Sequence, residues 1–444
     1  MPSQGTIGDR VRGLRLNRRM SQAQLAGPDL SDSYVSLIES GKRTPTPVVA
    51  RLLAERLGCT TEFLLHGIEP RQRIDTELGL RHAELELQHG DPAVAADRYT
   101  EIVKVADEEN AMLTAQARFG RARALEAQGR LGQAVEAFER LRREAAAHPE
   151  RLADLPITIA LSRCYHRAGD RLRARDLASK ALEQAERMSI EQGEIATDLA
   201  LALVEAHSDR TGDSAELAFV KRVLDVAGLG EIMDRSGEVR ALWRASATAA
   251  AGEDSALAVR LADDAIDAGR DQRIALQAAR AAMRWARLDW APVDEAERFS
   301  SAAERVFASA HREHERGEAL IVLARVMLRA AQPERAETLT GEALGLLGGG
   351  TAAAEAHLVR ATLAVARQAS PADHLNAARI VLDGAGHQAY GTDRTVARCW
   401  RELGDLYGQV GDRSQQTAAY RKALEAAGVR SMMAGLPVDA TIAR

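Results

Sequence analysis

The chain has 444 residues, of which 46% are hydrophobic, 28% are charged and 4% are aromatic. This length indicates two or more domains, or one small domain joined to a repeat array. Abundant alanine and few aromatic residues favour closely packed helices over a β-sheet. The net charge of −5 argues against a protein that binds nucleic acid over its whole surface.

The N-terminus lacks the apolar core of a signal peptide, and no apolar run reaches the length of a membrane span. Cys59, Cys164 and Cys399 are far apart and form no CxxC pair, so we expect reduced, buried thiols. These features predict a cytoplasmic protein with no membrane partner.

Positive charge is concentrated near the N-terminus. Residues 1–67 contain nine Lys and Arg and six Asp and Glu, a net charge of +3, whereas the remaining residues carry −8. A basic N-terminal segment followed by an acidic remainder is typical of a DNA-reading domain that is joined to a domain with another role.

Residues 1–67 predict five short helices, over residues 7–18, 22–26, 32–40, 47–58 and 61–66. Ser21 and Ser31 are suitable N-caps for the second and third helices, and Thr46 with Pro47 begins the fourth. Thr60 caps the fifth. A linker is expected at residues 68–75, because Pro70 cannot continue a helix.

The runs 21–26 and 31–43 predict two short helices joined by a tight turn. Together with residues 7–12 they resemble the XRE family of lambda-repressor-like helix-turn-helix proteins, and the similarity extends to about residue 67. The resemblance implies a five-helix DNA-binding domain whose third helix enters the major groove of a double-stranded operator.

The resemblance also implies DNA-contacting residues at the start and on the outer face of the third helix: Ser31, Asp32, Ser33, Ser36 and Leu37. Gln22 would contact a phosphate, and Lys42 and Arg43 would meet the DNA backbone. Arg15 and Glu39 match an ion pair that the family places beneath this surface. The alternative is an interaction module that no longer reads DNA. Asp32 favours it, since phosphates repel a carboxylate in the groove unless that carboxylate accepts from cytosine.

After about residue 75 the sequence is periodic and helical. Gly90, Gly129 and Gly169 recur at intervals of 39 and 40 residues, longer than the tetratricopeptide period of about 34. The clearest unit resembles a tetratricopeptide repeat through Trp400, Leu403, Gly404, Tyr407, Gly411, Asp412, Tyr420, Ala423 and Leu424.

The repeats predict about nine helix pairs over residues 76–427, stacked as an α-solenoid with one concave face. Residues 428–444 should form a loose tail. Small side chains are expected where the two helices of a pair meet: Ala83, Ala122, Ser162, Ala245, Ala324 and Gly404.

Repeat positions on the first helix of each pair predict a ligand groove lined by arginines, amides and one histidine: Gln88, Gln116, Arg123, Arg163, His166, Arg167, Arg325, Arg329, Arg398, Arg401 and Gln409. Arginine suits carboxylates, and amides suit a peptide backbone. This pattern predicts an anionic ligand or one with a free carboxylate. Alternatively, the arginines pair with acids such as Glu126 and Asp405 and leave no free positive field.

No motif predicts an enzyme, a metal site or a cofactor. His311 and His314 lack the His-Glu-x-x-His spacing of a zinc peptidase, and the run 348–350 lacks the Lys-Ser/Thr that follows a phosphate loop. No nucleophile, base and orienting group occur in a catalytic arrangement.

The combination of domains resembles the RRNPP group of peptide-sensing regulators. It implies a homodimeric transcriptional regulator whose superhelix senses a short peptide or a partner protein. The alternative is a scaffold in which the superhelix sequesters a partner protein and the helix-turn-helix does not read DNA.

Overall fold

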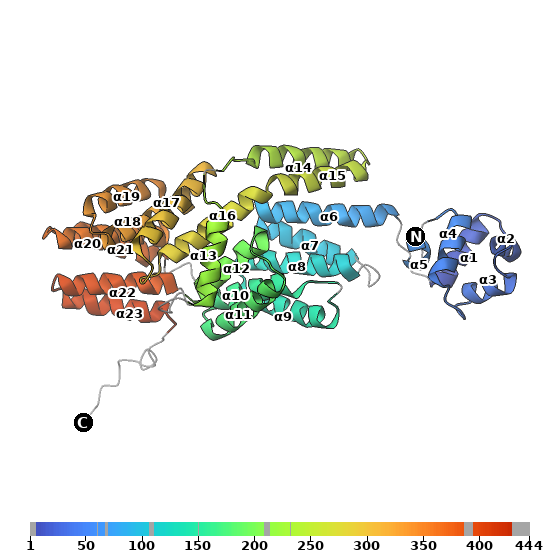
Figure 1. Ribbon diagram of the computed structural model, residues 1–444, viewed down its shortest axis with the longest axis horizontal. Helices are drawn as coiled ribbons and strands as arrows, with labels where there is room; N and C mark the ends of the chain where they lie inside the picture. Colours follow the sequence, from blue (N-terminus) through green and yellow to red (C-terminus); the bar gives the residue numbers. More distant parts are fainter. Residues whose placement is uncertain are drawn as a thin grey trace, which may run out of the picture. The chain divides into compact units, whose positions relative to one another are not determined.

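The computed structural model describes residues 6–59, 61–66, 70–105, 111–149, 151–207, 214–230, 232–385 and 394–428. All regular secondary structure in these ranges is α-helical, which confirms the all-α prediction (Figure 1). Helices α1–α5 form the N-terminal domain, and α6–α23 form the helical array. Within the same ranges, no helix is long and apolar enough to cross a membrane.

The N-terminal helices follow their capping residues. They are α1 (Ile7–Asn17), α2 (Gln22–Ala26), α3 (Asp32–Glu39), α4 (Pro47–Arg56) and α5 (Thr61–His66). The hydroxyl groups of Ser21, Ser31 and Thr46 accept hydrogen bonds from backbone N–H groups in the first turns of α2, α3 and α4. These caps satisfy donors that have no partner within the helix. Thr60, the predicted fifth cap, lies outside the described residues.

The core of the N-terminal domain brings α1, α2, α3 and α4 together through Val11, Leu25, Val35, Ile38 and Leu53, all 1% exposed or less. Helix α1 also approaches the end of α3 very closely. A Cβ atom added at Gly8 would lie 2.4 Å from the carbonyl oxygen of Ile38. Glycine at this position therefore fixes the spacing between α1 and α3.

Replacing Gly8 by alanine is expected to force α1 away from α3 and to destabilise the N-terminal domain by about 1–3 kcal/mol. Gly13 in the same helix provides the matched control, because nothing lies within 4 Å of its added Cβ atom. Alanine there should stabilise α1 by about 0.5–1 kcal/mol. Hydrogen exchange of the α1 and α3 amides in the full chain measures both effects. Equal effects at the two positions would contradict the close approach.

The array consists of α6 (Pro70–His89), α7 (Pro92–Val105), α8 (Ala111–Ala127), α9 (Leu131–Ala147), α10 (Asp154–Ala168), α11 (Arg171–Arg187), α12 (Gly193–Ala206), α13 (Ala215–Val226), α14 (Ser236–Ala251), α15 (Ser255–Ala268), α16 (Arg270–Ala286), α17 (Val293–Ser309), α18 (Glu313–Arg329), α19 (Pro333–Leu346), α20 (Gly350–Ala366), α21 (Ala372–Ala385), α22 (Arg394–Gln409) and α23 (Arg413–Ala426).

The array begins earlier than predicted. Helix α6 starts at Pro70, inside the range 68–75 that was expected to be a linker. Proline is well suited to the first position of a helix, where its missing N–H has no intrahelical acceptor to lose. Residues 67–69, and the predicted tail from residue 429 onward, lie outside the described residues.

Small side chains do lie between the paired helices, with one shift in register. The hydroxyl of Ser162 in α10 donates to the carbonyl of Ala174 in α11 at 2.7 Å. Ser246 in α14 makes the same bond to Ala258 in α15, also at 2.7 Å. The predicted contact residue Ala245 is instead exposed. One residue is about 100° of helix rotation, so Ser246 takes the inward position.

The chain divides into two compact units. Unit 1 contains residues 1–128 and 238–266, and unit 2 contains residues 129–237 and 267–444. In unit 1, apolar side chains of α6, α7 and α8 share one core. In unit 2, the largest core joins side chains from α10–α13 and α16–α20.

Candidate nucleic-acid interface and ligand-binding residues

The turn between α2 and α3 is held by α4. Gly27 adopts a positive φ of 52°, which suits glycine after the end of a helix. The guanidinium of Arg56 donates to the carbonyl of Leu25 at 3.1 Å, also donates to that of Ala26, and pairs with Asp29. Arg56 therefore caps the end of α2 and fixes the turn. Sequence reasoning missed this role, since the contact joins residues about 30 positions apart.

Helix α3 presents a polar face to solvent. Val35, Ile38 and Glu39 are buried against the domain, whereas the predicted DNA-contacting side chains are exposed: Ser31, Asp32, Ser33, Ser36 and Leu37. Hydroxyl groups bond to either bases or phosphates, and Leu37 offers an apolar contact for a thymine methyl. The exposed face of α3 therefore consists mainly of short polar side chains.

Two cations follow α3. Gly41 has a φ of 71°, and the backbone N–H groups of Lys42 and Arg43 donate to the carbonyl of Leu37 at 3.0 and 3.2 Å. The guanidinium carbon of Arg43 lies 4.7 Å from the centre of the Tyr34 ring. The turn thus places two exposed positive side chains beside the exposed face of α3.

The ion pair expected between Arg15 and Glu39 is present. The Arg15 Nε and Nη2 atoms lie 2.6 and 2.9 Å from the two carboxylate oxygens, and Arg15 also donates to the carbonyl of Met20. The two side chains are 11% and 5% exposed. The pair ties α1 to the end of α3.

The amide of Gln22 donates to Glu39 at 2.8 Å, so in this structure Gln22 supports the ion pair. The phosphate contact expected for Gln22 stays a prediction. Burial disfavours ionised Glu39, but hydrogen bonds from Arg15 and Gln22 outweigh it and lower the pKa of that carboxyl. Arg15, Gln22 and Glu39 therefore form one polar network across α1, α2 and α3.

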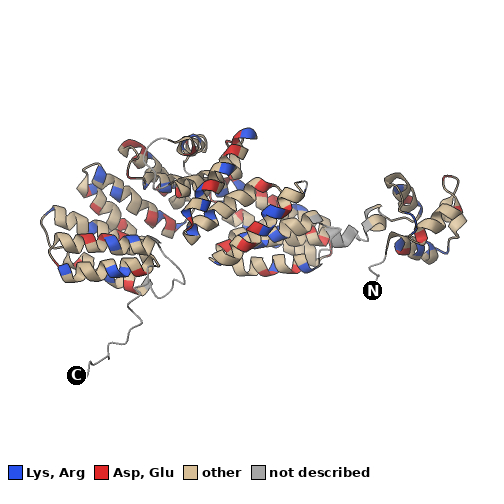
Figure 2. Cartoon of the chain, turned by 90° about the horizontal axis from the view of Figure 1, so that it is seen from below, with Lys and Arg blue, Asp and Glu red and all other residues tan. Residues whose placement is uncertain are grey.

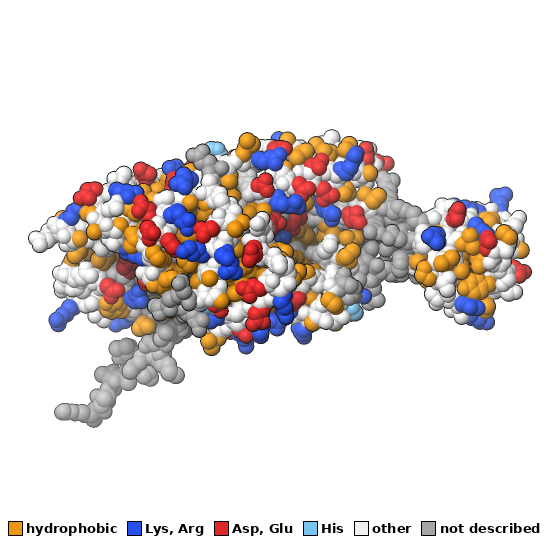
Figure 3. Space-filling view, in the orientation of Figure 1, with side chains coloured by type: hydrophobic (Ala, Val, Ile, Leu, Met, Phe, Trp, Pro, Cys, Tyr) orange, Lys and Arg blue, Asp and Glu red, His pale blue; other side chains and the backbone are white. Residues whose placement is uncertain are grey.

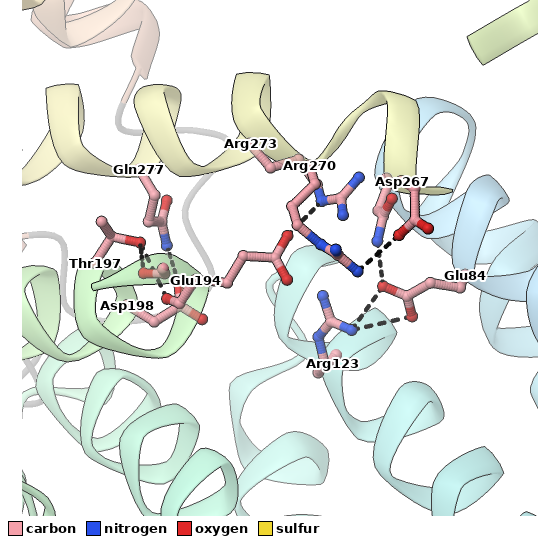
Figure 4. Close-up of polar contacts among 11 residues, drawn as sticks. Glu84, Arg123, Glu194, Thr197, Asp198, Asp267, Arg270, Arg273 and Gln277 are labelled. Carbon is pink, nitrogen blue, oxygen red and sulfur yellow. Dashed lines mark hydrogen bonds and ion pairs between the residues drawn. The ribbon is translucent and has the colours of Figure 1, made fainter. Parts of the chain in front are cut away.

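Two predicted groove residues of unit 1 contact a half-buried carboxylate, Glu84. Arg123 lies 2.9 Å from Glu84 (Figure 4). Gln88 also donates to Glu84, and the Tyr99 hydroxyl donates to it at 2.8 Å. Burial opposes ionisation of Glu84, but Arg123, Tyr99 and Gln88 together outweigh burial and lower the pKa of Glu84. Gln116 is exposed.

The predicted groove arginines of unit 2 are also engaged. Arg163 lies 3.5 Å from Asp198, Arg325 forms a two-pronged pair with Glu402 at 3.0 and 2.9 Å, and Arg398 pairs with Glu355. Arg329 donates to the carbonyls of Leu288 and Ala291. His166 is half-buried, and Arg167, Arg401 and Gln409 are exposed.

These pairs match the alternative, in which the arginines pair with acids. Carboxylates from neighbouring helices compensate Arg123, Arg163, Arg325 and Arg398. Basic and acidic side chains are interspersed along the helices of the array (Figure 2) and on the face in view in Figure 3. The ligand expected for these residues, anionic or with a free carboxylate, stays a prediction.

The buried carboxylate of Glu355 pairs with two arginines of unit 2. Glu355 in α20 is 2% exposed and pairs with Arg287 at 3.1 Å and with Arg398. Burial opposes its ionisation, but the charges of Arg287, Arg398 and Arg325 lower the pKa of Glu355 to about 2. Sequence reasoning missed Glu355 because its partners come from α16 and α22.

No cluster of three or more metal-ligating side chains occurs among the described residues. His311 precedes α18 and has a φ of 53°, whereas His314 lies within α18, so the two histidines do not share a helix.

Comparison with known proteins identifies the N-terminal domain. Residues 11–64 match the family model described as helix-turn-helix. This segment is therefore a helix-turn-helix domain of the XRE type. No curated protein matches the chain.

Several solved structures resemble the chain at low identity. The apo form of the quorum sensor NprR from B. thuringiensis has a TM-score of 0.46 and 9% identity, with 95% of this chain and 99% of that chain covered. PlcR from Bacillus thuringiensis, in complex with the peptide PapR7 and DNA, has a TM-score of 0.29 and 12% identity, covering 81% and 98%. The apo competence regulator ComR from Streptococcus vestibularis has a TM-score of 0.17 and 12% identity, covering 96% and 98%.

Proposed function

We propose that the protein is a cytoplasmic transcriptional regulator that reads double-stranded DNA with α3 and receives a ligand on its helical array. The observation that carries the first part is the exposed face of Ser33, Ser36 and Leu37, followed directly by Lys42 and Arg43. Base contacts from the helix and phosphate contacts from the cations are the two components of sequence-specific binding.

The network beneath this face supports the same function. Arg15, Gln22 and Glu39 fix α1, α2 and α3 relative to one another. A recognition helix discriminates between bases only if its side chains are held in register with the base edges. A rigid support directly behind α3 is therefore what a DNA reader needs.

The array is proposed to bind a short peptide or a partner protein. Stacked helix pairs offer an extended surface, and in unit 2 exposed Arg401 and Gln409 provide donors for a peptide backbone. The ligand affects DNA binding only if its affinity differs between two conformations of the chain. A homodimer is proposed, because two linked domains on a palindromic operator gain affinity over one.

A scaffold that sequesters a partner protein is the second candidate. Asp32 favours it, because this exposed carboxylate stands at the start of α3, and α3 itself contains neither Lys nor Arg. The two functions differ in one observable: a scaffold does not select a DNA sequence.

Replacing Ser33 and Ser36 together by glutamate is expected to lower the affinity for DNA fragments about 100-fold or more, equivalent to about 2.8 kcal/mol. Two carboxylates would face phosphates and base edges. Both residues are exposed, so the fold should persist. Titration of labelled genomic fragments at low salt measures the effect.

The Ser33→Ala, Ser36→Ala variant is the matched control, since it removes the hydroxyls without adding charge. It should weaken sequence discrimination and keep the salt-dependent affinity. Unchanged binding by the glutamate variant would show that α3 does not meet DNA.

A further inference from the structure

The chain leaves unit 2 and returns to it. Residues 129–237 and 267–444 belong to unit 2, but residues 238–266 between them belong to unit 1. This insert is almost all of α14 and α15, which pair through the bond from Ser246 to Ala258. In a simple solenoid each helix pair contacts its neighbours along the sequence. The α14–α15 hairpin departs from that order.

Unit 2 is continuous without the hairpin. Helix α12 packs directly on α16, although α13, α14 and α15 separate them in sequence. Arg273 in α16 lies 2.8 Å from Glu194 in α12, and Gln277 donates to Asp198 (Figure 4). Leu199 and Leu276 lie in the same buried cluster. The stack therefore does not depend on α14 or α15 to bridge its helices.

The hairpin instead contacts α6, more than 160 residues earlier. Arg81 lies 2.9 Å from Asp263, His82 Nε2 lies 2.9 Å from the Ser246 hydroxyl, and Ser255 donates to Asp75 at 3.0 Å. Figure 1 shows α14 and α15 beside α6. These polar bonds join one face of α6 to the insert.

The ion pair in this contact is partly exposed to solvent. The Arg81 and Asp263 side chains are 32% and 47% exposed, and exposed ion pairs contribute little to stability. The buried apolar cluster that contains Leu80 and Ala83 of α6 has its described members in α6, α7 and α8. Most of the surface of α14 is accessible, with Val239 and Ser246 as its buried residues. Segments with few buried contacts and solvent-exposed bonds open most readily.

The connections of the hairpin are unequal. Helix α15 ends at Ala268 and α16 starts at Arg270, so Gly269 alone separates them. Asp267 pairs with Arg270 at 2.7 Å across this junction. On the other side, about nine residues connect α13 to α14. The hairpin is therefore joined to α16 by a single residue and to α13 by a longer connection.

We propose that the α14–α15 hairpin is a detachable latch on α6. The hairpin separates from α6 while α12 and α16 remain packed on each other. This separation exposes one face of α6. That helix begins at Pro70, four residues after α5 ends at His66, so the latch braces the array helix nearest in sequence to the helix-turn-helix domain.

Charge reversal in the full chain tests the latch by hydrogen exchange. Arg81→Glu and Asp263→Arg should each accelerate exchange in residues 238–266 and 74–89 about tenfold, because a freed two-helix hairpin is marginally stable. The double variant Arg81→Glu, Asp263→Arg restores the pair with reversed signs and should return exchange to the original rate. Asp263→Asn gives a milder break if a reversal prevents folding.

Amides of α12 and α16 should exchange at the same rate in every variant. Arg260→Glu supplies the matched control, since Arg260 is an exposed residue of α15 and forms none of the three bonds described above. Two results would overturn the proposal. One is unchanged hairpin exchange in Arg81→Glu, Asp263→Arg and Asp263→Asn. The other is acceleration of α12 and α16 together with the hairpin, which would make the hairpin an integral part of the stack.

Discussion

Replacing Glu39 by glutamine is expected to destabilise the N-terminal domain by about 3–5 kcal/mol. The Arg15 side chain is 11% exposed, so its charge would stay buried without a compensating anion. The amide of the new glutamine would also face the amide of Gln22, which now donates to Glu39. Hydrogen exchange of the α1 and α3 amides in the full chain measures the loss.

The control is the double variant Arg15→Met, Glu39→Leu. It removes both charges, and apolar replacement of a buried pair is often neutral or stabilising. Recovery of the slow exchange would show that the single variant suffers from an uncompensated charge. A Glu39→Gln variant as stable as the original would contradict the buried network.

The same pair sets a pH dependence. The pKa of Glu39 is lower in the folded domain than its ordinary value of 4.5. Its contribution to stability is therefore complete above that ordinary value and is lost as the pH falls through the lower folded value. Arg15 stays charged over this range and adds no titration of its own. Loss of the α1–α3 contact on acidification should be smaller in the double variant.

Replacing Glu355 by glutamine is expected to destabilise unit 2 by about 3–5 kcal/mol. Glu355 is 2% exposed and compensates Arg287 and Arg398. Trp285, Trp290 and Trp400 lie in unit 2, so tryptophan fluorescence during urea unfolding reports mainly on this unit.

Glu337→Gln is the control for this experiment. This substitution breaks the ion pair between Glu337 and Arg367. Both side chains are exposed, so the free energy of unfolding should change little. The pKa of Glu355 is about 2, so its contribution is complete above pH 4.5 and is lost only as the pH falls toward 2. Similar losses in the two variants would show that burial of Glu355 does not matter.

The N-terminal domain could be predicted because its determinants are local. Caps such as Ser21 and Thr46 act on backbone groups within three residues, and Pro47 fixes the start of α4. The Arg15–Glu39 pair could be predicted only through the family resemblance. Nothing in the sequence shows that the amide of Gln22 donates to Glu39.

The ion pairs within the array could not be predicted from the sequence. Repeat periodicity predicted paired helices, but the partners of Arg325 and Arg398 lie 77 and 43 residues away. Their acids, Glu402 and Glu355, are adjacent only after the helices stack. The contact between α6 and the α14–α15 hairpin has no local signal at all, since solenoid order predicts contacts between successive pairs.

Selection from a pool of random DNA duplexes by the full chain tests the central claim most directly. We expect the retained duplexes to share one sequence motif. We also expect the Ser33→Glu, Ser36→Glu variant to enrich no motif under the same low-salt conditions. Retention without a shared motif by the original protein, or the same motif retained by the variant, would contradict DNA reading by α3.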